Sequence, residues 1–96
     1  MPVSFSLGHI AITPGALEAL RRQGVAPETL LNRHSRGEWG DLDEEDLGRN
    51  DQALVTGERL LSVYPLAAGV TVWVITEAAD EDGTRSATTI LLPTEY

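Results

Sequence analysis

The spacing of apolar residues changes twice along this chain and divides it into three parts. Residues 3–7 alternate apolar and polar side chains, which predicts a half-buried strand at the N-terminal end. The phase shifts after Gly8, and Ile10 and Ile12 then take the apolar positions. A glycine at such a break indicates a bulge or a sharp bend.

The second part of the chain contains residues that are typical of the starts and ends of helices. Thr13 followed by Pro14 predicts a helix start, because a threonine caps free backbone N–H groups and a proline fits the first helical position. Gly24 is expected to end this helix. Pro27 predicts the start of a second helix in the same way, and Gly37 its stop.

A third helix is predicted from Asp41 to Gly57. Asp41 and Glu44 have the spacing of a capping box in its carboxylate form, and acidic residues at this end suit the helix dipole. The residues expected on its inner face are Leu42, Leu47, Ala53 and Leu54.

The third part predicts three strands, at residues 59–66, 70–78 and 84–92. The middle one is apolar on both faces, which is typical of a central strand. The segregated order predicts one α+β domain spanning residues 1–96. We expect an N-terminal strand, three short helices and a three-stranded antiparallel meander, with the helices on one face of the sheet.

Composition narrows the classes of function. The net charge is −8, so direct binding to nucleic acid is not expected. The chain contains no cysteine, which excludes a disulfide or thiolate metal site. It has neither an apolar run near the ~18 residues of a membrane span nor the layout of a signal peptide. A cytoplasmic location without membrane contact is the expectation.

Residues 33–50 hold most of the unusual chemistry. His34 has two interpretations: a packed ring between leucines, or a general acid or base. In the second case Arg36 or Arg85 would stabilise charge on phosphate, as in a small ribonuclease-like toxin. Trp39, between two glycines, is either an exposed partner-binding residue or a plug between helices. Arg85 also belongs to a hydroxyl-rich strand that either solvates one face of the sheet or cradles a phosphate.

The carboxylates have alternatives of their own. Asp41, Glu44 and Glu45 are candidates for binding a protein partner, or simply solvate a helix start. Asp46 and Asn50 project inward, which predicts a structural polar anchor to Arg36, Arg85 or loop N–H groups, or else a carboxylate in a pocket. The two histidines provide too few nitrogen ligands for zinc, so neither a metal nor a cofactor is expected.

Several segments together resemble a known family. These are residues 13–20, 30–42, 44–46, Asn50, 59–64, 73–78 and 88–96. They are similar to a family of small bacterial proteins often encoded on plasmids and other mobile elements. This chain has Glu38 where the family has an aspartate, and a longer acidic insertion at residues 80–83. The resemblance implies an accessory of a mobile element and supplies no catalytic residue.

These observations predict a non-enzymatic protein-interaction module. Its partner would contact Trp39, Asp41, Glu44 and Glu45, and the chain itself would be a monomer or a homodimer. The ribonuclease-like toxin is the alternative, and a small-molecule sensor with a pocket between helices and sheet is a third. Whether the polar residues converge on one concave surface decides among them.

Overall fold

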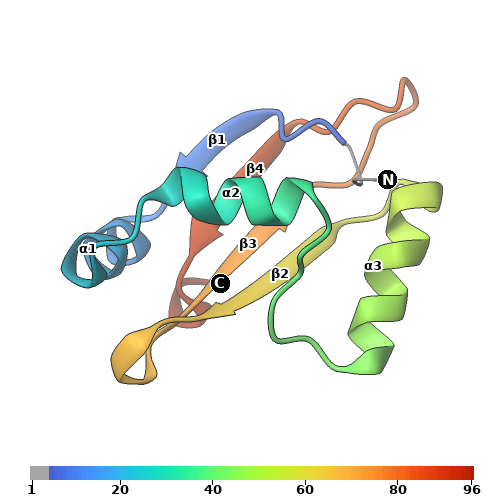
Figure 1. The fold of residues 1–96 in the computed structure, drawn as a ribbon. Coiled ribbons are helices and arrows are strands. Elements are labelled where there is room, and N and C mark those ends of the chain that lie inside the picture. The colour runs from blue at the N-terminus through green and yellow to red at the C-terminus, as the bar shows by residue number, and fades with distance from the viewer. Residues whose placement is uncertain (1–4) are drawn as a thin grey trace.

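A four-stranded mixed sheet forms the centre of the fold in the computed structural model, which describes residues 5–96 (Figure 1). Its strands are β1 (His9–Ile12), β2 (Leu60–Pro65), β3 (Thr71–Thr76) and β4 (Ala87–Leu91). The spatial order is β1-β4-β3-β2, with β1 parallel to β4 and the other pairs antiparallel. The α+β class is confirmed, but the sheet is a mixed one that includes the N-terminal strand, not a separate three-stranded antiparallel meander.

The first strand lies further along the chain than predicted. Residues 5–7 belong to no strand, and the rest of the predicted strand, residues 3 and 4, lies outside the described residues. The chain bends at Gly8, whose φ is +65°. A Cβ at this position would lie 2.3 Å from the carbonyl oxygen of Arg85, so the approach of these two backbones requires glycine. Directly after the bend, the His9 N–H donates to Ser86 O at 2.9 Å.

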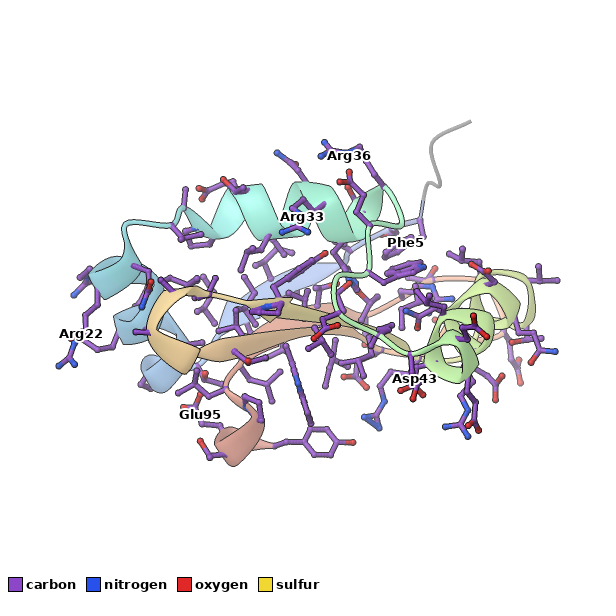
Figure 2. All side chains as sticks on the ribbon, turned by 60° about the horizontal axis from the view of Figure 1, so that its bottom comes forward. Phe5, Arg22, Arg33, Arg36, Asp43 and Glu95 are labelled. Carbon is purple, nitrogen blue, oxygen red and sulfur yellow. The ribbon has the colours of Figure 1, made fainter. Side chains whose placement is uncertain are left out.

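The first two helices cover one face of the sheet. α1 (Pro14–Gln23) begins where predicted, with the Thr13 side chain accepting from the Ala16 N–H, and ends at Gly24 in the left-handed region. α2 (Pro27–Ser35) lies over the sheet in Figure 2. The main core cluster between these layers contains Ala16, Leu20, Leu30, Tyr64, Val72, Val74 and Ile90.

The third helix lies beside β2 and not over the face of the sheet (Figure 1). α3 (Glu44–Thr56) is capped by Asp43, which accepts from the Asp46 N–H at 2.8 Å, so the predicted start at Asp41 is wrong. A second core cluster joins α3 to the sheet through Trp39, Ala53 and Leu60. Leu47, expected on the inner face, is exposed. The expectation that all helices share one face therefore fails for α3.

Two short 3-10 helices complete the fold. η1 (Ala67–Gly69) connects β2 to β3, and η2 (Pro93–Glu95) follows β4. The Glu95 carboxylate accepts from Thr13 Oγ1, Gly15 N and Leu92 N, and these bonds hold its pKa below the usual value. Residues near the C-terminus thereby fix the start of α1. No helix among residues 5–96 is long and apolar enough to cross a membrane.

Candidate functional site

His34 lies at the centre of a buried chain of hydroxyl groups. The side chain is 0% exposed. Nδ1 lies 2.5 Å from Ser62 Oγ, and Nε2 lies 2.9 Å from Thr76 Oγ1. The chain continues from Thr76 Oγ1 to Thr88 Oγ1 at 2.7 Å and from there to the Leu7 carbonyl at 2.7 Å. We refer to His34, Ser62, Thr76 and Thr88 together as the His34 chain.

The carbonyl at the end fixes the direction of every bond in the His34 chain. A carbonyl only accepts, so the Thr88 hydroxyl donates its single proton to Leu7 O. Thr88 must then accept from Thr76, and Thr76 must accept from an N–H on Nε2 of the histidine. A neutral His34 therefore carries its proton on Nε2 and accepts from Ser62 at Nδ1.

The surroundings of His34 keep it uncharged. Burial lowers its pKa to about 4, and the positive charge of Arg85 acts in the same direction. His34 is thus neutral near pH 7 and has no free lone pair directed at solvent, so it is not arranged to act as a general base.

Trp39 packs against this histidine and is not exposed. Its ring centroid lies 5.4 Å from that of His34 in an edge-to-face arrangement, and 6.2 Å from Phe5. The tryptophan is only 5% exposed. The interpretation of Trp39 as a surface residue for a partner is therefore wrong in this structure. Its burial against the second core cluster matches the plug alternative.

The arginines proposed for catalysis lie in different surroundings. Arg85 is buried, and its guanidinium donates to the carbonyls of Glu58, Glu77 and Ala53 at 2.7–3.0 Å. Arg36 is about half-exposed, and its Nε lies 2.7 Å from the Glu38 carboxylate. Figure 2 shows Arg36 on the outer side of α2, away from the sheet. Within the described residues His34 bonds to Ser62 and Thr76 and to neither arginine, so the ribonuclease-like set does not assemble.

Of the two predicted anchors, only Asn50 lies inside. Its Nδ2 donates to Leu61 O at 2.6 Å and its Oδ1 accepts from Leu61 N at 3.1 Å. These two bonds pair the backbone N–H and C=O of Leu61 on the outer edge of β2, as a neighbouring strand would. Asp46 is half-buried and lies 3.7 Å from Arg49, not beside Arg36, Arg85 or a loop N–H. The prediction of a buried Asp46 anchor is wrong, because the inner face was assigned partly from Leu42 and Leu47. Leu42 lies before the start of α3, and Leu47 is exposed.

The remaining predicted residues form an acidic turn on the surface, which we define as Asp41, Glu44 and Glu45. All three are exposed. Glu45 lies 2.8 Å from Arg49, while no ion pair to Asp41 or Glu44 forms among the described residues. The Asp41 N–H donates to Val63 O at 2.7 Å, and the Trp39 carbonyl accepts from Val63 N at 2.9 Å. The loop leading into the acidic turn is therefore held against β2.

An open groove on the surface lies away from these residues. This open groove of about 510 Å³ is lined by Arg49, Gln52, Ala53, Glu58 and Arg59. It includes none of His34, Arg36, Trp39 and Asp46. No cluster of three or more His, Asp or Glu side chains that could hold a metal ion occurs in residues 5–96. The polar residues thus disperse over interior and surface and do not line one concave site.

Sequence reasoning missed the partners of His34. Ser62 lies between apolar residues of β2, and Thr76 ends an apolar strand. A polar residue on the strand face that packs against the helices was the sequence signal that could have identified these partners. Thr88 and Arg85 were assigned to a solvated or phosphate-binding face, but both are buried. Every buried side-chain nitrogen or oxygen within the described residues has a hydrogen-bond partner.

No family model, no curated protein and no solved structure matches this chain.

Proposed function

We propose that this chain is a non-enzymatic protein-binding module that docks a basic protein surface through its acidic turn. The observation that carries the proposal is the rigid display of Asp41, Glu44 and Glu45. Backbone bonds to Val63 hold one side of this loop, and Asp43 caps the helix on the other. A backbone held in this way loses little conformational freedom when a partner binds.

The electrostatics of the chain support the same role. The net charge of the chain is −8, and the acidic turn concentrates negative charge in one part of the surface. This distribution favours the approach of a positively charged surface. The internal use of His34 and Arg85 supports a binding role over catalysis, since both are consumed by hydrogen bonds inside the fold. In line with the resemblance to proteins encoded on mobile elements, the partner is a host or plasmid protein with a basic surface.

The test is a charge reversal with a matched control. Glu44→Lys with Glu45→Lys changes the net charge by the same amount as Glu81→Lys with Asp82→Lys in the exposed turn before β4. A partner captured by crosslinking from bacterial cells should be lost with the first pair and kept with the second. Capture should also weaken as salt rises, because the contact is electrostatic. Equal capture by both double variants would show that the acidic turn is not the docking surface.

A further inference from the structure

The two edges of the sheet differ. On β2, backbone groups of Leu61 and Val63 are bonded by Asn50 and by the loop at Trp39 and Asp41. On β1, the His9 N–H donates to Ser86 and the Thr13 N–H to Ile90, so alternate residues from 9 to 13 face β4. Ile10 and Ile12 consequently direct their N–H and C=O groups away from the sheet. Within residues 5–96 no neighbour bonds to these outward groups.

The β1 edge also lacks the features that normally prevent pairing. Residues 9–12 contain no proline, lysine, arginine, aspartate or glutamate. Ile10 is 37% exposed. Leu17 occupies the helix position that pairs with Ile12 in a hydrophobic staple, and it is 40% exposed. β1 forms one edge of the sheet (Figure 1), and the exposed side chains of Ile10 and Leu17 lie on and beside this unpaired edge.

We propose that β1 pairs in antiparallel fashion with β1 of a second copy of this chain, which joins the two sheets into one. Ile10 and Ile12, the two outward-facing residues, flank Ala11 symmetrically. With Ala11 on the two-fold axis, Ile10 lies opposite Ile12 of the second copy. Their N–H and C=O groups then bond in both directions, and the contact is the same on both copies.

The side chains and charges favour a second copy as the occupant. Ile12 packs against the main core cluster, and Ile10 shares its face of the strand. Pairing places each Ile10 beside Ile12 of the other copy and so covers exposed apolar surface. The net charge of −8 repels two copies at long range, but the edge itself is neutral. Added salt should therefore strengthen this contact, whereas it should weaken docking at the acidic turn.

A single cysteine tests the register directly, because the natural chain has none. In the proposed dimer the two Ala11 residues form a non-hydrogen-bonded pair with Cα atoms about 4.5 Å apart, within the range that a disulfide requires. Ala11→Cys should therefore crosslink under mild oxidation. Val55→Cys is the control, since this side chain is 88% exposed on α3. We expect Ala11→Cys to crosslink at least about tenfold faster.

Sedimentation equilibrium over a concentration series tests the backbone contact. Ile10→Pro removes the outward N–H while the bonds between β1 and β4 remain, and should raise the dimer Kd by about tenfold or more. Ile10→Lys should act likewise through charge. Ile10→Val keeps both groups and should stay close to wild type, and circular dichroism checks that each variant is folded.

Three results would overturn the proposal. The first is a wild-type chain that sediments as a monomer up to about millimolar concentration, where an association of a few kcal/mol is already visible. The second is a dimer whose Kd changes with neither Ile10→Pro nor Ile10→Lys. The third is equal crosslinking of the two cysteine variants. If the Ala11→Cys variant instead crosslinks to a segment of another protein while the chain stays monomeric, the edge binds a foreign strand and a second copy is the wrong occupant.

Discussion

His34 and the acidic turn come from the same polar stretch of sequence, residues 33–50, yet they lie in opposite environments. His34 and Trp39 face the sheet and are buried, whereas Asp41, Glu44 and Glu45 are exposed. The inner group is neutral and fully hydrogen-bonded, and the outer group is charged and mostly unpaired. A high density of polar residues in a sequence therefore does not by itself indicate one site, because helical phase and strand register divide it between scaffold and surface.

Among the variants that test this contrast, Trp39→Ala should cause the largest loss of stability. Trp39→Ala leaves a cavity beside His34 and Phe5, so we expect a loss of about 3–5 kcal/mol in the free energy of unfolding. Urea unfolding measures it. The matched change on the acidic turn, Glu44→Ala, should alter stability by less than about 0.5 kcal/mol. A Trp39→Ala protein as stable as Glu44→Ala would place the tryptophan on the surface.

The pH dependence of stability should separate the two regions further. The pKa of folded His34, about 4, lies below its ordinary value of 6.5, so the unfolded chain takes up the proton first as the pH falls. The neutral, buried His34 therefore contributes about 3 kcal/mol to the free energy of unfolding above pH 6.5. This stabilisation is lost as the pH falls from about 6.5 to about 4.

Unfolding between about pH 7 and 5 measures this slope before most carboxylates titrate. His34→Gln should flatten the curve. A slope that His34→Gln does not reduce would contradict the neutral, buried histidine.

A pair of threonines on β4 tests the hydroxyl directions. Thr88→Val removes the acceptor of the Thr76 hydroxyl and leaves Leu7 O without its donor, so we expect a loss of about 1–3 kcal/mol. Thr89→Val, on the opposite face of the same strand, should change stability by less than about 0.5 kcal/mol. Chemical unfolding of both variants measures the difference. Equal losses would show that the His34 chain contributes nothing specific.

Two glycines near the acidic turn should respond in opposite directions, and Gly48 should give the smallest effect of all. A Cβ at Gly48 meets nothing within 4 Å, so Gly48→Ala should stabilise α3. The expected gain is about 0.5–1 kcal/mol. Gly40 has a φ of +80° and a Cβ there would lie 2.0 Å from Val63 O, so Gly40→Ala should destabilise. Thermal unfolding of both variants measures this, and a destabilised Gly48→Ala would contradict an open outer face of α3.

Local rules predicted most helix boundaries, though not the start of α3, and nonlocal contacts explain the features that periodicity missed. Thr13 and Gly57 act through bonds to residues a few positions away, and Pro27 acts through its fixed φ angle. The parallel pairing of β1 with β4 joins His9 to Ala87, and no spacing rule along the chain contains that contact.

The candidate site was harder to predict than the fold. Asp41 and Asp43 both fit a helix cap, and the backbone bond of Asp41 to Val63 decides between them. Thr88 and Thr89 are alike in sequence, and only strand register buries the first. Both choices depend on tertiary contacts, which hydrophobic periodicity does not contain.

The central claim is that His34 is a neutral structural ring with its proton on Nε2. Nitrogen-15 NMR of the histidine side chains over a pH series tests it most directly, with His34→Gln identifying the signals. The account predicts the Nε2–H tautomer near pH 7 and a midpoint at about 4, the pKa that burial imposes. A His34 ring with its proton on Nδ1, or one that titrates near 6.5, would contradict it.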